Sequence, residues 1–222
     1  MLHHLAIQNT YDIFEMALFQ DNTLIDYLSE DKRHTSKLFI PMLDQLCTKN
    51  NIAFANLDFC AVNAGPGPFS TLRSVIASVN GLHMATSVPL ISIDGLNATF
   101  TEFYDDHYEY TVILLNAFNN EVYYLIAHKN QIISKGYKNI HLLLQEIVQE
   151  YENQSIHFLG NGVILYDNLI KEIYTDNELI KINVMSMCSI KTIGDLGLRM
   201  FLNKEVISSE YLMPLHLKKF TF

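Results

Sequence analysis

Residues 64–73 read Ala-Gly-Pro-Gly-Pro-Phe-Ser-Thr-Leu-Arg and follow the apolar stretch Phe-Cys-Ala-Val at residues 59–62. Glycine and proline at alternating positions break both helices and strands, so this stretch is a loop. Ser70 or Thr71 can cap a helix that runs from about residue 72 to residue 86. The sequence therefore predicts a strand, a loop and a helix in direct succession.

The loop residues Gly65, Pro66, Gly67 and Pro68 have two interpretations, a phosphate-binding loop and a structural turn. Backbone N–H groups at a helix start attract anions, so the loop can form a phosphate cradle. Pro66 and Pro68 lack N–H groups, however, and the Gly-x-x-x-x-Gly-Lys-Ser/Thr pattern is absent. We therefore favour a rigid strand-to-helix turn.

Apolar periodicity predicts an alternating α/β chain on both sides of this loop. The expected strands are residues 2–7, 14–19, 24–28, 59–62 and 90–93, then 111–115, 122–127, 131–134, 156–159 and 179–184. The first expected helix has its cap at residues 34–36, Pro41 near its start and an apolar face that ends at Leu46. The other expected helices are 72–86, 94–105, a segment capped by Asn139, 165–174 and 190–203.

The order strand-strand-strand-helix-strand-helix-strand-helix thus occurs twice, with a junction near residues 105–109. Stacked α/β layers with mixed sheets are the natural packing of such an order. The duplicated order resembles the actin and sugar-kinase architecture. We expect two tandem actin-like (RNase H-like) lobes with mixed sheets flanked by helices, at residues 1–106 and 107–222.

Composition excludes several classes of protein. The 222 residues are 49% hydrophobic and 18% charged, which excludes a disordered chain. Fifteen Lys and Arg against 24 Asp and Glu give a net charge of −9, so we expect little binding of tRNA by this chain alone. No apolar run approaches about 18 residues, no signal peptide is visible, and three cysteines form no even framework. We expect a cytoplasmic protein with no membrane partner.

No catalytic or metal-binding pattern stands out. The nine histidines form no His-x-x-x-His pair, and Gly-x-Ser-x-Gly is absent. Cys60 lies in an apolar strand, which favours a core cysteine over a nucleophile. Asp105-Asp106 is either a carboxylate pair for catalysis or a solvated loop, and Asp94 is either a base or a helix cap; we favour the second interpretation of each. The sequence predicts no catalytic residue, no metal and no cofactor.

The helix at residues 72–86 carries two stripes. A helix on a sheet needs only an apolar stripe, whereas small residues permit another helix to approach closely. Glycine inside a helix costs about 1 kcal/mol unless such an approach uses it. The neighbour is either the helix at residues 38–46 or a helix of another subunit, and the pattern leaves both open. The apolar stripe is Leu72, Val75, Ile76, Val79 and Leu82; the small stripe is Ser74, Ala77, Ser78, Gly81 and Ala85.

Residues 64–73 resemble the Gly-Pro-Gly-Ser-Phe-Thr-Gly-Leu-Arg signature of the TsaB (YeaZ) family. Other segments agree in the same order along the chain, closely in the first lobe and loosely in the second. They are His34-Thr-Ser-Lys-Leu-Phe-Ile-Pro41 (family His-Ser-x-x-Leu-Leu-Pro), Asn80-Gly-Leu82 (Lys-Gly-Leu), Val88-Pro-Leu90 (Ile-Pro-Leu), Ser92-Ile-Asp-Gly-Leu96 (Val-Ser-Ser-Leu), Glu121-Val-Tyr123 (Glu-Val-Tyr), Gly160-Asn-Gly162 with Tyr166 (Gly-x-Gly and a tyrosine) and Tyr211-Leu-Met-Pro214 (Tyr-Leu-Arg).

This resemblance implies a function exerted through a partner. The family is a non-catalytic scaffold and activator in the bacterial machinery that makes threonylcarbamoyladenosine (t6A) in tRNA. It implies binding to the catalytic subunit TsaD, association with the ATPase TsaE and with tRNA only through the complex, and self-association through the same face. Mapped onto this chain, the partner-binding residues are His34, Leu38, Pro41, Met42, Phe69, Leu72, Arg73, Ala77 and Gly81.

The chain also departs from the family pattern. Gln8 stands where the family has an aspartate that helps actin-like ATPases hold magnesium and phosphate, and Asn116-Ala-Phe118 replaces Asp-Ala-Arg. Pro68 replaces a serine, Thr71 a glycine and Met213 an arginine. We therefore expect no nucleotide hydrolysis, with ATP or ADP at a partner interface as an open alternative. The alternative functions are a small actin-fold ATP-dependent kinase or peptidase-like enzyme, and a divergent stand-alone homodimer.

Overall fold

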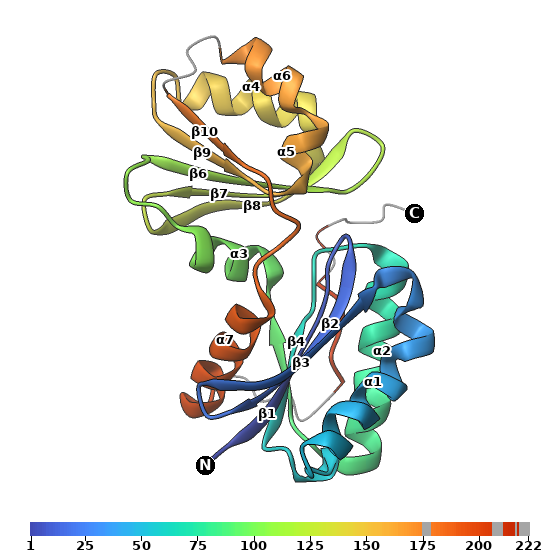
Figure 1. The fold of residues 1–222 in the computed structure, drawn as a ribbon. Helices are drawn as coiled ribbons and strands as arrows, with labels where there is room; N and C mark the ends of the chain where they lie inside the picture. Colours follow the sequence, from blue (N-terminus) through green and yellow to red (C-terminus); the bar gives the residue numbers. More distant parts are fainter. Residues whose placement is uncertain (175–178, 206–210, 216, 218–222) are drawn as a thin grey trace. The chain divides into compact units, whose positions relative to one another are not determined.

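The computed structural model of the chain describes residues 1–174, 179–205, 211–215 and 217 (Figure 1). The described residues fold into an α/β structure with two five-stranded mixed sheets, as predicted. Among them, no helix is both long and apolar enough to cross a membrane.

The first sheet has the strand order β3-β2-β1-β4-β5. The three strands joined by hairpins pair antiparallel, whereas β1, β4 and β5 pair parallel through helical crossovers. The strands are β1 (His3–Asn9), β2 (Ile13–Gln20), β3 (Thr23–Asp31), β4 (Phe59–Asn63) and β5 (Leu90–Ile93).

The second sheet repeats this arrangement. Its order, β10-β9-β6-β7-β8, reads from the opposite edge as a hairpin-connected triple followed by two parallel strands. The strands are β6 (Tyr110–Asn116), β7 (Glu121–His128), β8 (Gln131–Asn139), β9 (Ile156–Leu159) and β10 (Ile180–Asn183). The predicted duplication of element order is therefore confirmed in the pairing of the strands.

Helices cover both faces of the first sheet. Helices α1 (Thr35–Lys49) and α2 (Phe69–Thr86) lie on one face, and α7 (Ile190–Leu202) lies on the other (Figure 1). The strands alternate accordingly, because successive side chains of a strand point to opposite faces. On β1, Leu5 and Ile7 pack toward α1 and α2, while Ala6 packs in the cluster with α7.

The position of α7 corrects the predicted domain boundary. The first compact unit contains residues 1–98 together with 188–215, and the second begins at Thr99 and includes residues up to Met187. The division at residues 106 and 107 is therefore wrong, because α7 packs on the first sheet although it follows the second sheet in the chain. Helix α3 (Gly95–Phe103) contains the boundary between the units.

Two glycines let α7 approach the sheet closely. A Cβ atom on Gly194 would lie 2.6 Å from the Phe19 ring, and one on Gly197 would lie 2.4 Å from Cβ of Ala61. Real Cβ atoms do not approach this closely, so the helix fits here only because both side chains are missing. Gly81 on α2 is different, because a Cβ there would meet no described residue outside its own helical turn within 4 Å.

We expect Gly197→Ala to lower the free energy of unfolding by about 1–3 kcal/mol, because the added methyl overpacks the α7–β4 contact. The same change at Gly81 is the matched control and should raise it by up to about 1 kcal/mol, because alanine is the better helix former. Urea denaturation of both variants measures the two effects. Equal effects of the two substitutions would contradict the close packing of α7.

The second unit places α4 (Ile140–Glu150), α5 (Asn161–Leu165) and α6 (Asp167–Ile173) beside its sheet. Asn139 caps α4 by accepting a hydrogen bond from the His141 N–H, as predicted. The expected turn at residues 160–162 leads directly into α5. Gly160 has φ +105° and lies against the Leu114 carbonyl, where a Cβ would be 2.3 Å away, so a side chain is excluded at this position.

Several predicted helix boundaries need correction. Helix α2 begins at Phe69 with Pro68 as its N-cap, so neither Ser70 nor Thr71 caps it. Pro41 lies at the seventh position of α1 rather than near its start, and no side chain caps that helix. Short 3-10 turns that were not predicted occupy Lys32–His34 and Phe54–Asn56. The expected helix at 165–174 corresponds to α6, and the additional short helix α5 begins inside the expected turn at 160–162.

Candidate functional site

The outward side of α1 and α2 carries most of the predicted partner-binding residues. The exposed ones are His34, Pro41, Phe69, Arg73, Ala77 and Gly81, and Leu38 is half-buried. On α2 the residues 69, 73, 77 and 81 follow each other at intervals of four, which places them along one side of the helix. We call these seven residues the α1–α2 face.

Met42 and Leu72 were also predicted for this face, and the structure contradicts both. They are only 4% and 5% exposed and belong to the core between the helices and the first sheet. Two exposed apolar residues were missed: Ile40 is 56% exposed and Met84 is 68% exposed. Met84 lies seven residues after Ala77, which is two helical turns, so helical spacing alone would have found it.

The small-residue stripe of α2 is exposed at three of its positions. Ala77, Gly81 and Ala85 are exposed, and among the described residues no atom beyond the neighbouring helix backbone lies within 4 Å of a Cβ built on Gly81. Helix α2 packs beside α1, and its half-buried Leu82 lines a groove together with residues of α1 and packs against the core. These three residues of the stripe are accessible to a helix of another subunit, and that interpretation of the stripe stays a prediction.

One cation stands on the face. The Arg73 guanidinium lies 3.8 Å from the centroid of the Phe69 ring, one helical turn earlier. This is the distance of a cation–π contact, which holds both side chains against the surface of α2. The face therefore combines small residues with an ordered aromatic ring and a positive charge.

A groove of about 510 Å³ lies beside the face, between the second half of α1, the Phe54–Asn56 turn and α2. Burial raises the pKa of the Cys47 thiol in its wall, and the charge of Asp44 adds to this effect. Cys47 is therefore not an activated nucleophile. The groove is lined by Ile40, Leu43, Asp44, Cys47, Thr48, Asn51, Ile52, Ala53, Phe54 and Leu82.

The loop at residues 65–68 uses its polar groups within the chain. The Gly65 N–H donates to Oδ1 of Asn63 at 2.9 Å, and the Gly65 carbonyl accepts from the Gly95 N–H at 2.8 Å. Gly65 has φ +107° and is buried, as is Pro66. A Cβ on Gly65 would also lie 2.8 Å from Leu72. These contacts are those of a rigid turn that joins β4 to α2.

A buried hydrogen-bond network occupies the ends of β1 and β4. The Gln8 amide donates to Oε1 of Glu15 at 2.9 Å and to the Cys188 carbonyl at 2.8 Å. Its oxygen accepts from the Asn63 amide at 2.7 Å. The second oxygen of Glu15 accepts from the Tyr27 hydroxyl at 2.9 Å. Both amide hydrogens of Gln8 and its oxygen are thus engaged inside the protein.

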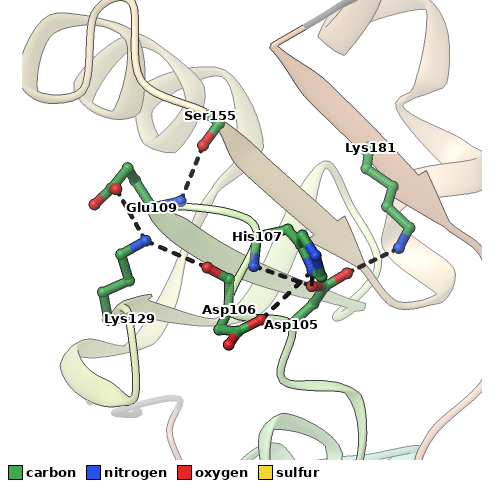
Figure 2. Close-up of polar contacts among 7 residues, drawn as sticks. All are labelled: Asp105, Asp106, His107, Glu109, Lys129, Ser155 and Lys181. Atoms are coloured by element: carbon green, nitrogen blue, oxygen red, sulfur yellow. Dashed lines mark hydrogen bonds and ion pairs between the residues drawn. The ribbon is translucent and has the colours of Figure 1, made fainter.

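Among the residues that the structure describes, one group of three side chains could supply metal ligands: Asp105, Asp106 and His107. Their ligand atoms lie within 4.8 Å of one another. Figure 2 shows Asp105 between two partners: His107 Nδ1 lies 2.7 Å from one carboxylate oxygen, and Lys181 donates to the other at 3.1 Å. These hydrogen bonds, that of His107 foremost, hold the pKa of Asp105 well below its usual range. Asp105 thus already has its compensating charge.

Neighbouring charges extend this network. Lys129 lies 2.9 Å from Oε1 of Glu109 and donates to the Asp106 carbonyl at 3.3 Å, and the Glu109 N–H donates to Ser155 Oγ at 3.0 Å (Figure 2). The arrangement links the start of β6 to the β7–β8 hairpin and to β10. We interpret it as an ion-pair network of the second unit, in line with the solvated loop expected for Asp105-Asp106.

The two remaining candidates from the sequence have structural roles. Asp94 accepts hydrogen bonds from the N–H groups of Leu96 and Asn97 at 3.0 and 3.1 Å, which is the helix cap that was predicted. Cys60 is fully buried in β4, and burial raises the pKa of its thiol, as expected for a core cysteine.

Comparison with known proteins gives a consistent assignment. A family model described as TsaD, tRNA N6-adenosine threonylcarbamoyltransferase, matches residues 29–206, which is more than half of the chain. Proteins named tRNA threonylcarbamoyladenosine biosynthesis protein TsaB are 21% identical in Haemophilus influenzae, over 96% of this chain and 92% of the relative, and 22% identical in Escherichia coli, over 96% and 94%. The chain belongs to the TsaB/YeaZ family.

A solved structure agrees with this fold. A Pseudomonas aeruginosa protein described as similar to peptidase YEAZ superimposes with a TM-score of 0.78 at 18% identity, covering 98% of this chain and all of that chain. This TsaB/YeaZ member therefore has the two-lobed actin-like fold that the element order predicted.

The network around Gln8 fits the neutral amide at this position of the TsaB/YeaZ member. Burial raises the pKa of Glu15 above its ordinary value of 4.5, although the hydrogen bonds from Gln8 and Tyr27 oppose the shift. A neutral amide at position 8 can donate to this carboxylate, whereas a second carboxylate would repel it. The ends of β1 and β4 thus hold one buried carboxylic acid, Glu15, beside one hydrogen-bond donor, the Gln8 amide.

We expect the raised pKa of Glu15 to make stability depend on pH. The contribution of Glu15 to the free energy of unfolding is fully present below its pKa in the unfolded chain, near 4.5. It is lost as pH rises through the pKa of Glu15 in the folded protein, because the ionised carboxylate is disfavoured in the core. Glu15→Gln should remove this fall. Urea denaturation between pH 4 and pH 7 measures it, with the exposed Glu30→Gln as the matched control. A fall that persists in Glu15→Gln would contradict the assignment.

Proposed function

We propose that this protein is a non-catalytic scaffold and activator subunit of the t6A modification complex that binds a TsaD-like catalytic subunit through the α1–α2 face. Its TsaB relatives, aligned over nearly the whole chain, support involvement in t6A biosynthesis. In this proposal a TsaE-like ATPase and tRNA associate only through the complex, in the cytoplasm, and a homodimer uses the same face.

The observation that carries the proposal is the exposed small-residue stripe of α2. Gly81 costs the helix about 1 kcal/mol relative to alanine, and no side chain in the part of this unit that the structure describes approaches it closely enough to need the missing side chain. Ala77 and Ala85 belong to the same exposed surface and likewise carry small side chains. A partner helix can lie against it at close range, and small residues are what such packing requires.

The non-catalytic role is supported by the ends of β1 and β4. The position where actin-like ATPases hold magnesium and phosphate carries Gln8, and this amide is committed to Glu15, Asn63 and the Cys188 carbonyl. A phosphate or a hydrated magnesium ion would have to displace several buried hydrogen bonds. Each group left unsatisfied would cost about 1–3 kcal/mol.

We expect Ala77→Arg to abolish binding of the TsaD-like subunit while keeping the melting temperature, because the residue is exposed and the added chain is bulky and charged. Co-purification of the two subunits, with a dissociation constant from calorimetry, measures the effect. Leu202→Arg is the control, since Leu202 is 62% exposed on α7 at the other face of the sheet. Normal binding by Ala77→Arg would refute the proposed face.

The isolated chain is expected to show no turnover of magnesium-ATP, because its phosphate-binding position is filled by its own side chains. Phosphate release from the purified chain, compared with the reconstituted complex, tests this. Turnover by the isolated chain that Gln8→Ala or Glu15→Gln abolishes would instead establish a small actin-fold kinase or another ATP-dependent enzyme.

A further inference from the structure

Residues 211–215, which we call the C-terminal strap, lie against α2 without belonging to a helix or strand. The side-chain amide of Asn80 on α2 makes two hydrogen bonds to the backbone of Leu212 in the strap. Its oxygen accepts from the Leu212 N–H at 2.8 Å, and its nitrogen donates to the Leu212 carbonyl at 3.0 Å. The Leu215 N–H donates to the Ala64 carbonyl at 2.8 Å. The strap is thus fixed at two points of the first unit.

The strap also shares the core of that unit. Leu212 is only 4% exposed and packs in the same cluster as Leu72, Val75 and Val79 of α2. Its two neighbours are exposed instead, Tyr211 by 56% and Met213 by 73%. Anchoring Leu212 therefore holds a tyrosine and a methionine at the surface next to α2.

The strap flanks the α1–α2 face on the side away from α1. At 100° per residue, Asn80 lies about 60° around α2 from Ala77 in one direction, and Leu82 lies about 140° from it in the other. Leu82 borders the groove that α1 forms, and Asn80 holds the strap. The exposed stripe of α2 consequently runs between α1 on one side and the strap on the other.

We propose that the C-terminal strap is a third element of the partner-binding surface, and that Tyr211 and Met213 contact the TsaD-like subunit. The inference rests on the proposed function and adds residues that its two-helix face does not contain. Tyrosine and methionine are enriched in protein interfaces, and Arg is the cation most often found there. Arg73, pinned on Phe69, completes an apolar surface with one positive charge.

The partner chemistry follows from this composition. The small stripe accepts a helix, and the flanking Tyr211 and Met213 contact apolar side chains on that helix. Because the strap is already fixed by Asn80 and by Leu212, little ordering remains to be done when the partner binds, which favours affinity. A carboxylate of the partner can pair with Arg73 at the same surface.

The test is the affinity of the Tyr211→Ala/Met213→Ala double variant for the co-purified TsaD-like subunit, measured by calorimetry. We expect the dissociation constant to rise at least about tenfold, with an unchanged melting temperature because both side chains are exposed. Leu202→Ala removes a comparably exposed apolar side chain from α7 and should leave the dissociation constant unchanged.

Ala77→Arg is measured in parallel so that the two proposals fail separately. If it abolishes binding while the double variant binds like the wild type, the strap is not part of the surface and the inference is overturned, although the proposed function stands. If Ala77→Arg itself binds normally, the docking face is wrong and both proposals fall. Slower oxidation of Met213 in the complex than in the free chain would support the inference, and an equal rate would overturn it.

Discussion

The central strands of the first sheet carry apolar side chains on both faces, and this constraint determines the rest of the first unit. Leu5 and Ile7 of β1 face one layer, and Ala6 faces the other, with the same alternation on β4. Each layer must be covered, since exposed apolar surface costs about 25 cal/mol per Å². Helices α1 and α2 cover one face, and the chain must return with α7 to cover the other.

Covering both faces has a consequence for the outer side of α2. Its inward residues are used by the sheet, and one flank is used by α1, so the stripe with Ala77 and Gly81 is left to solvent in this unit. The glycine weakens its own helix there, in contrast to Gly197, whose missing side chain the α7–β4 contact uses. The proposed contact with a partner helix gives this glycine a use that the described residues of the first unit do not show.

The sequence predicted most of the fold because the signals were local. Apolar periodicity located all ten strands that the structure describes, and Asn139 and Asp94 were identified as helix caps from their residue type and position. The domain boundary was missed because element order does not show on which sheet α7 packs. The cap of α2 was missed because Pro68 starts the helix without a side-chain hydrogen bond.

The candidate site was only partly predictable for a related reason. Helical spacing identified the small stripe with Ala77 and Gly81 but left its neighbour open. Met42 and Leu72 share the apolar chemistry of a docking residue, yet they are used by the core. The contacts of Gln8 and Asn80 join residues that are distant in the chain: Gln8 with Cys188, and Asn80 with Leu212. No local pattern contains such pairs, so only the folded structure reveals them.

These two long-range contacts act on different parts of the first unit. Gln8 makes hydrogen bonds with polar groups at the strand ends. Displacing its buried amide from Glu15 would leave these groups without a partner, which is costly. Asn80 satisfies the backbone of Leu212 at the edge of α2 and leaves Tyr211 and Met213 outside. The first contact leaves these polar groups hydrogen-bonded within the first unit, and the second enlarges an accessible surface. Both contacts agree with the proposed subunit that acts by binding, since the polar groups of Gln8 are hydrogen-bonded inside the protein while Tyr211 and Met213 remain exposed.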